Sequence, residues 1–153
     1  MEDNFDDNEL LSSVEEKKKV ENQLTGIAGE FFVAAELAKR NFQVALTLGN
    51  AKGIDLFATN QVTLKTFEIE VKTLRKKPNC FTLKVERLKD DKIFVFVYLN
   101  EKDLSPDYYI VAGKEILSAL QHYYGASLHT TRQTVNHGPL KIHKGRWDKL
   151  GQI

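Results

Sequence analysis

Residues 26–73 read GIAGEFFVAAELAKRNFQVALTLGNAKGIDLFATNQVTLKTFEIEVKT, and this stretch decides the fold because its hydrophobic period changes from helix to strand. Over residues 24–40, which begin just before this stretch, apolar side chains recur at helical spacing, and Lys39 and Arg40 suit the end of a helix. The second part of the stretch favours extended structure, with turn-forming pairs between apolar segments. We therefore predict a helix followed by three strands, at residues 42–48, 54–59 and 66–73.

The region before this stretch is predicted to extend the helix. Ser13 and Glu16 form an S-x-x-E capping pattern, so a helix is expected to begin near Val14 and to run on, with a bend at Thr25–Gly26. Residues 1–12 are acidic and lack a usable period, so they are expected to be a disordered tail. Residues 13–153 are then a single domain, since no linker or repeat interrupts them.

The second half of the chain adds further strands and a helix. The run IFVFVYL, residues 93–99, is continuously apolar and β-branched, as in a strand covered on both faces. Further strands are predicted at residues 80–85 and 108–112, a helix at 114–124, and no clear element at 125–145. The predicted class is α/β, an N-terminal helix followed by a mixed β-sheet flanked by helices.

Composition and charge narrow the functions that fit. The net charge of the 153 residues is +1, but residues 1–20 carry −4 and the remainder +5, which permits a polyanionic partner as readily as an ordinary solvated surface. Cys80 is the single cysteine, so no internal disulfide is possible and a reducing, cytoplasmic setting is expected. No apolar run reaches the roughly 18 residues of a membrane span, so no membrane partner is expected.

Four charged residues form the candidate site: Glu30, Asp55, Glu70 and Lys72. An antiparallel hairpin of the second and third strands would bring Asp55 beside Glu70, and the two-residue spacing puts Glu70 and Lys72 on one strand face. Carboxylates of this kind hold Mg²⁺, which neutralises charge on a phosphate and lowers the pKa of a bound water. A neighbouring lysine can hold or deprotonate the attacking water or stabilise the pentavalent state.

The ordered set G-x-x-x-E (Gly26 to Glu30), G-x-D (Gly53 to Asp55) and E-x-K (Glu70 to Lys72) resembles the PD-(D/E)XK nuclease superfamily. The layout is most similar to archaeal-type Holliday-junction resolvases and small uncharacterised bacterial relatives. The resemblance implies a restriction-endonuclease-like α/β core. It also implies a catalytic set of Asp55, Glu70, Lys72 and Glu30, in which the three carboxylates bind Mg²⁺ or Mn²⁺ and Lys72 acts on the water or transition state.

The resulting functional hypothesis is a Mg²⁺-dependent endonuclease that hydrolyses phosphodiester bonds in DNA, with structure selectivity and a homodimer left open. The alternatives are a nuclease fold that binds nucleic acid or protein without cutting, and a strand face whose charges are incidental. Two minor interpretations follow from the same sequence. Arg75, Lys76 and Lys77 either contact phosphates or form a solvated turn, and Trp147 is a packing anchor rather than a base-stacking residue.

Overall fold

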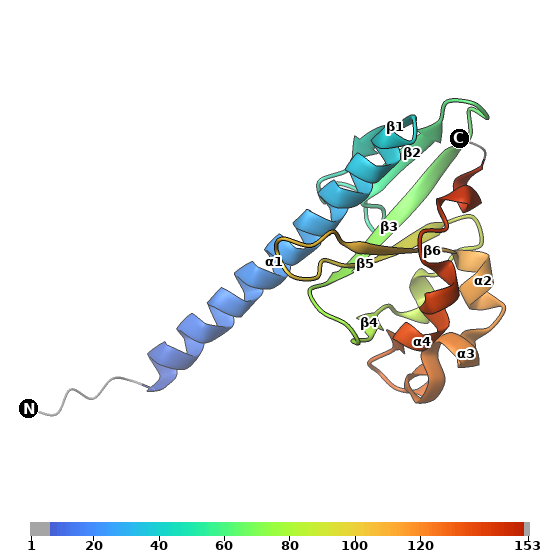
Figure 1. The fold of residues 1–153 in the computed structure, drawn as a ribbon. Coiled ribbons are helices and arrows are strands. Elements are labelled where there is room, and N and C mark those ends of the chain that lie inside the picture. The colour runs from blue at the N-terminus through green and yellow to red at the C-terminus, as the bar shows by residue number, and fades with distance from the viewer. Residues whose placement is uncertain (1–6, 152–153) are drawn as a thin grey trace, which may run out of the picture.

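The computed structural model describes residues 7–151 and confirms the α/β class with a helix ahead of a mixed sheet (Figure 1). In chain order its elements are α1 (Asp7–Lys39), β1 (Phe42–Leu46), β2 (Leu56–Asn60), β3 (Thr66–Leu74), β4 (Phe81–Thr82), the 3-10 turn η1 (Val85–Arg87), β5 (Ile93–Tyr98), β6 (Asp107–Ala112), α2 (Gly113–Leu117), α3 (Leu120–Tyr124), η2 (Gly125–His129), β7 (Thr134–Val135), α4 (His137–Leu140), η3 (Lys141–His143) and η4 (Trp147–Leu150). None of the helices among residues 7–151 combines the length and apolarity needed to cross a membrane.

Helix α1 is longer than the sequence predicts and continues without interruption through Thr25–Gly26. It begins at Asp7, so residues 7–12, predicted to be disordered, are helical, while residues 1–6 of that tail lie outside the described residues. Ser13 is inside the helix and donates its hydroxyl to the Leu10 carbonyl (2.8 Å) instead of capping the N-terminus. Extending an existing helix adds one hydrogen bond per residue without a new nucleus, which favours an earlier start than the capping pattern indicates.

The sheet has five strands in the order β1-β2-β3-β5-β6. The predicted hairpin is confirmed, because β2 and β3 pair antiparallel with Leu56 opposite Ile69. Strands β3 and β5 pair in parallel, with Glu70 opposite Phe94, and β6 completes the sheet antiparallel to β5. Every residue of β5 is buried, as predicted for its continuous apolar run. Strand β3, which lies in the middle of the sheet, can therefore place side chains on both faces within the protein.

The two faces of the sheet carry separate apolar cores. On one face, Val33 and Leu37 of α1 pack with Ile69, Val71 and other buried residues of the sheet. Trp147 belongs to this core and is buried, so its predicted role as a packing anchor is confirmed. On the other face, Phe94 and Phe96 belong to a core shared with residues of α2, α3 and α4, which Figure 1 shows gathered at one end of the domain.

The segments around these helices differ from the sequence prediction in detail. The strand predicted at residues 80–85 is only β4, two residues long, and pairs with β7 in a separate two-stranded sheet. The helix predicted at 114–124 is divided into α2 and α3 at Ser118–Ala119, because Ala119 adopts a non-helical conformation (φ −146°, ψ 46°). Short local elements of this kind carry no hydrophobic period long enough to recognise.

Helix α1 approaches β3 closely at Gly29. A Cβ added to Gly29 would lie 1.8 Å from Thr73 Oγ1 and 2.8 Å from Thr73 Cβ, which a side chain cannot tolerate. A Cβ at Gly26, three residues earlier on the same helix, would meet no atom within 4 Å. The close approach holds α1 against the centre of the sheet, where Glu30 follows Gly29 directly.

We expect Gly29→Ala to destabilise the fold by about 1–3 kcal/mol, since overpacking a closed contact costs this much. The matched control is Gly26→Ala, which should be neutral or stabilising by roughly 0.5–1 kcal/mol because alanine favours the helix over glycine. Urea denaturation of both variants measures the difference. Equal stability of the two variants would contradict the close contact between α1 and β3.

Candidate active site

Asp55 lies one residue before β2 and reaches across to β3. Its backbone N–H donates to the Ile69 carbonyl (2.9 Å), so the hairpin pairing continues beyond the end of the strand and sets Asp55 beside Glu70. Its Oδ2 accepts a hydrogen bond from the Val71 N–H (2.6 Å). The turn before Asp55 includes Gly53, whose φ of +72° favours glycine because L side chains rarely adopt it. This local structure fixes the position of the Asp55 carboxylate relative to β3.

Glu70 is almost completely buried, with 1% of its surface exposed, and its carboxylate contacts three cations. Lys72 Nζ lies 2.8 Å from Oε1, Arg87 Nη2 lies 3.0 Å from Oε1, and Lys92 Nζ lies 2.5 Å from Oε2. The residue spacing puts Lys72 on the same strand face, as predicted. Because a buried carboxylate without a partner is very costly, these three contacts keep Glu70 ionised inside the protein.

Arg87 and Lys92 are site residues that the sequence did not indicate. Arg87 lies in η1 and Lys92 directly precedes β5; Lys92 is 4% exposed, which is unusual for a lysine. The parallel register places Phe94 opposite Glu70, so Lys92, two residues before Phe94, leaves the sheet on the same face. The only sequence signal is a lysine immediately before a buried strand, and it becomes informative only when the β3–β5 register is known.

The carboxylates of the site differ in their electrostatic environments. Burial raises the pKa of Glu30, and the charge of Asp55 raises it further. Burial also raises the pKa of Asp55, and the charge of Glu70 adds to the rise. The Val71 hydrogen bond and the charges of Lys72 and Lys92 offset it only in part. For Glu70 burial acts in the same direction, but the contacts with Lys72 and Lys92 outweigh it, so its pKa is lowered. The Glu30–Asp55 side of the site is therefore short of positive charge, whereas Glu70 is well supplied.

A small cationic pocket adjoins Glu70. It has a volume of about 150 Å³. A Cβ added to Gly53 would lie 2.9 Å from Arg87 Nη2 and 3.2 Å from Lys92 Nζ, so glycine keeps this space open. Arg87 Nε is buried and has no hydrogen-bond partner among residues 7–151. Such a pocket suits an anion of the size of a phosphate group. Its lining residues are Lys52, Gly53, Ile54, Glu68, Arg87, Lys89 and Lys92.

The site offers carboxylates for a divalent cation, although it is not a complete metal centre. Within residues 7–151 no three Asp, Glu, His or Cys side chains are grouped so as to hold a metal ion. Asp55 and Glu30 fit one end of such a site. Burial and a neighbouring carboxylate disfavour the ionised form of each, and a bound cation would relieve this. Glu70 Oε1 is buried and contacts Lys72 and Arg87, so it could accept a divalent cation only once one of these two moves away.

The structure places Arg75, Lys76 and Lys77 in ion pairs beyond the end of β3. Arg75 contacts Glu21 of α1 (3.3 Å) and Lys76 contacts Glu101 (3.4 Å). Lys77 pairs with Asp107, and this contact raises the pKa of the lysine. The spacing along an extended strand separates Arg75 from Lys72 by about 10 Å. Contact of these three residues with phosphates therefore stays a prediction, while the cations that meet the buried carboxylate are Lys72, Arg87 and Lys92.

Comparisons with known proteins give one similar fold and no family. No protein-family model matches the chain, and no curated protein matches it either. Among solved structures, the bacterial homing endonuclease I-Ssp6803I is similar with a TM-score of 0.43 and 14% sequence identity, covering 63% of this chain and 72% of that chain. A likeness this distant does not assign an activity, and the PD-(D/E)XK resemblance remains a prediction.

The opposite electrostatic environments of Asp55 and Glu70 predict opposite effects of neutralisation on stability. At pH 7 without divalent cations, Asp55→Asn should raise the melting temperature, because the ionised form of a group with a raised pKa opposes folding. Glu70→Gln should instead lower stability by about 3–5 kcal/mol, because it leaves Lys92 buried without its anion.

The pH dependence follows from the same shifts. The benefit of Asp55→Asn should grow as pH rises above about 3.9, where the unfolded aspartate ionises. The stability that wild-type Glu70 contributes is present above about pH 4.3 and is lost as pH falls through its lower folded pKa. Melting curves of both variants and wild type across this range test the assignment, and two variants with shifts of the same sign would contradict it.

Proposed function

We propose that this protein is a divalent-cation-dependent endonuclease that hydrolyses phosphodiester bonds in DNA. The observation that supports the proposal is the meeting of Asp55, the buried Glu70 and Lys72 beside a cationic pocket. Hydrolysis of a phosphodiester needs carboxylates that bind a cation, positively charged residues that bind the phosphate, and a group that transfers or holds a proton of the attacking water. These three requirements correspond to three adjoining parts of the site.

Asp55 and Glu30 would hold Mg²⁺ or Mn²⁺, which prefers carboxylate oxygens, and Glu70 would complete the set once Lys72 or Arg87 moves away from it. When bound, such a cation neutralises charge developing on the phosphate and makes an attacking water more acidic. Asp55 is fixed for this role by the Val71 N–H bond, which orients its carboxylate before any ligand arrives. Glu30 reaches the site from α1. It lies near enough to Asp55 for the charge of Asp55 to raise the pKa of Glu30.

Lys72 is the residue best placed to act on the water or the transition state. It is partly exposed, with 27% of its side chain accessible, while its ammonium lies 2.8 Å from Glu70 Oε1. It can therefore exchange contact with Glu70 for contact with a bound phosphate or water. Lys92 is buried and held by Glu70, so it contributes a fixed positive charge. Arg87, whose Nε lacks a partner in the described structure, can donate to a phosphate oxygen.

The second candidate function is a nuclease fold that binds nucleic acid without cutting it. It is favoured by the three cations already in contact with Glu70, which neutralise the carboxylate that a divalent ion would otherwise use. In that case the cationic pocket would still take a phosphate, but addition of Mg²⁺ or Mn²⁺ would leave the protein and the bound DNA unchanged.

Cleavage assays on labelled duplex, branched and single-stranded DNA test the proposal. With Mg²⁺ or Mn²⁺ the wild-type protein should cut at least one substrate, and EDTA should stop the reaction. Lys72→Ala should lower the rate by roughly 10²–10⁴-fold, the usual contribution of a group that transfers or holds a proton, while retaining DNA affinity. Lys102→Ala, at an exposed loop position, is the matched control and should cut normally. Binding with no cleavage of any substrate under both cations would favour the second candidate.

The position of the phosphate-binding residues can be tested separately by binding. The double variant Lys52→Ala with Lys89→Ala should bind DNA more weakly and with less salt dependence. With fewer phosphate contacts, fewer counterions are released when the protein binds. Arg75→Ala with Lys76→Ala removes the same formal charge from residues already paired with Glu21 and Glu101. If the pocket rather than the β3 turn meets the backbone, fluorescence anisotropy should show the larger loss for the first pair. The reverse order would assign the DNA path to residues 75–77.

A further inference from the structure

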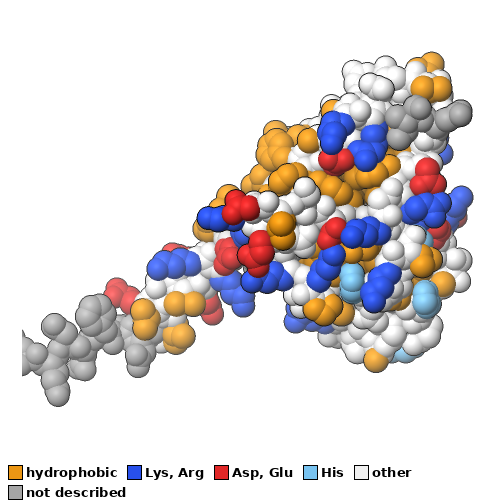
Figure 2. All heavy atoms as spheres, viewed as in Figure 1, with side chains coloured by type: hydrophobic (Ala, Val, Ile, Leu, Met, Phe, Trp, Pro, Cys, Tyr) orange, Lys and Arg blue, Asp and Glu red, His pale blue; other side chains and the backbone are white. Residues whose placement is uncertain are grey.

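Helix α1 exposes an apolar stripe along the side that faces away from the sheet. The buried positions of its second half are Thr25, Gly29, Val33 and Leu37, which recur every four residues. Other large apolar residues of the helix lie on the opposite side: Leu24 is 56% and Phe31 54% exposed. Hydrophobic side chains follow α1 from its projecting half to the body (Figure 2). The exposed large apolar residues of the helix are Leu10, Leu11, Val14, Val20, Leu24, Ile27, Phe31 and Phe32; the 3.6-residue period places Leu10, Val20, Leu24, Ile27 and Phe31 on the outward side and the other three away from it.

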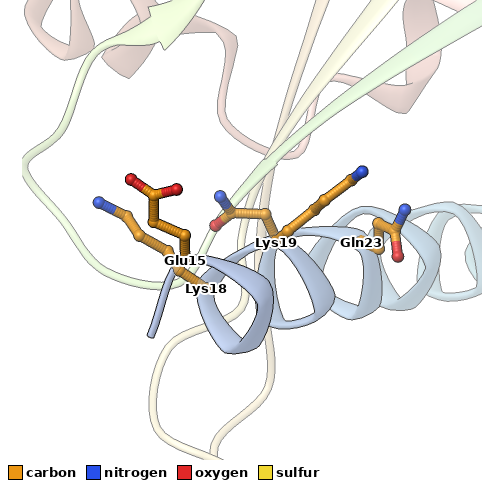
Figure 3. A pocket seen from close by; sticks show the side chains of 5 residues that line it. Glu15, Lys18, Lys19 and Gln23 are labelled. Atoms are coloured by element: carbon orange, nitrogen blue, oxygen red, sulfur yellow. The ribbon is translucent and has the colours of Figure 1, made fainter. Parts of the chain in front are cut away.

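The side of α1 that turns toward the domain is polar in the projecting half. Glu15, Lys18, Lys19 and Gln23 line a shallow pocket there (Figure 3). Lys18 also lines a second pocket with Thr73, Leu74 and Arg75, which places this side of the helix next to the end of β3. A surface helix normally buries its apolar side and exposes its polar side. The projecting half of α1 has the reverse arrangement relative to its own domain.

This surface is large enough for a stable interface. The five large apolar side chains on the outward side, Leu10, Val20, Leu24, Ile27 and Phe31, are each about half exposed and present on the order of 500 Å². With the flanking side chains of the same side, this area approaches what one partner contributes to a small specific interface. The projecting half also has little tertiary support, because residues 8–24 are exposed except for the half-buried Ser13, and the contact of Glu21 with Arg75 lies at the surface. Isolated helices of this length are marginal in water, so a partner that covers the stripe would also stabilise the helix.

We propose that two copies of this chain pair through α1 in antiparallel orientation, so that the projecting half of each helix covers the outward face of the other's second half. Along the stripe, Val20, Leu24, Ile27 and Phe31 recur at alternating spacings of four and three, the pattern of helices that pair lengthwise. A two-fold axis between Leu24 and Ile27 sets Leu24 against Ile27 of the second copy, and Val20 against its Phe31. The contact surface is then the same on both copies and closes as a dimer.

Charge selects the antiparallel orientation. A parallel pair in register would set Lys17, which interrupts the stripe, against the same lysine of the second copy, and Glu16 beside its Glu21. The antiparallel pair sets Lys17 against the small Ala34 of the second copy, where its ammonium can reach water, and Glu21 beside Ala28. The charged half of each helix thus meets a half whose outward face is uncharged.

Light scattering coupled to size exclusion tests the dimer on the full chain. The wild-type protein should be dimeric, and Val20→Glu or Phe31→Glu should each raise the dimer dissociation constant roughly thirtyfold or more, as loss of a central apolar contact does. Val20 lies in the projecting half, so its variant cannot disturb the core. Ile142→Glu, at a similarly exposed position away from α1, is the control and should remain dimeric. A wild-type monomer at all concentrations, including one that binds lipid vesicles instead, overturns the proposal.

Cysteine cross-linking tests the orientation. In a Cys80→Ser background, which removes the exposed native thiol, an equal mixture of Val20→Cys and Phe31→Cys chains should form a mixed disulfide-linked dimer on mild oxidation. Either variant alone should cross-link poorly, because its cysteines lie far apart on the antiparallel pair. Efficient cross-linking of each variant with itself would establish a parallel pair and overturn the arrangement proposed here.

Discussion

The buried carboxylate of Glu70 is the constraint on which the arrangement of several segments depends. A charge in the middle of a sheet is stable only if opposite charges and good geometry compensate for the water it has lost. Lys72 supplies one from the same strand, but Arg87 and Lys92 come from the segment that connects β4 to β5. The buried ion pair of Lys92 thereby ties this connection, which has no α-helix, to the centre of the sheet.

The positive charge is distributed unevenly among the three carboxylates of the site. Glu70 contacts three cations, whereas the pKa values of Asp55 and Glu30 are raised because burial outweighs the charges that act on them. A site with surplus positive charge on one side and surplus negative charge on the other is complementary to a cation–phosphate pair, in which the signs are reversed. The same arrangement explains why an ordinary solvated strand face is a poor description, since Glu70 is not solvated.

The sequence predicted those parts of the structure that depend on local spacing. The β2–β3 hairpin and the shared face of Glu70 and Lys72 follow from the two-residue period of a strand, and both are present. Arg87 and Lys92 could not be predicted, because their position depends on the parallel register of β3 with β5, strands that are distant in sequence. Helix α1 shows a related limit: its apolar period identified a helix, but not which side the sheet would cover.

The covered side of α1 combines a small residue where the helix crosses β3 with apolar residues further along the helix. Glu30 can reach Asp55 only if the helix lies close to β3, and close approach requires a small residue at the crossing point, which Gly29 provides. The inner side of α1 holds Gly29 at the crossing and Val33 and Leu37 beyond it, and Ile27 and Phe31 lie on the outer side. One rigid helix therefore links the position of Glu30 to the exposed stripe. A contact that holds the stripe also steadies the helix that delivers this carboxylate.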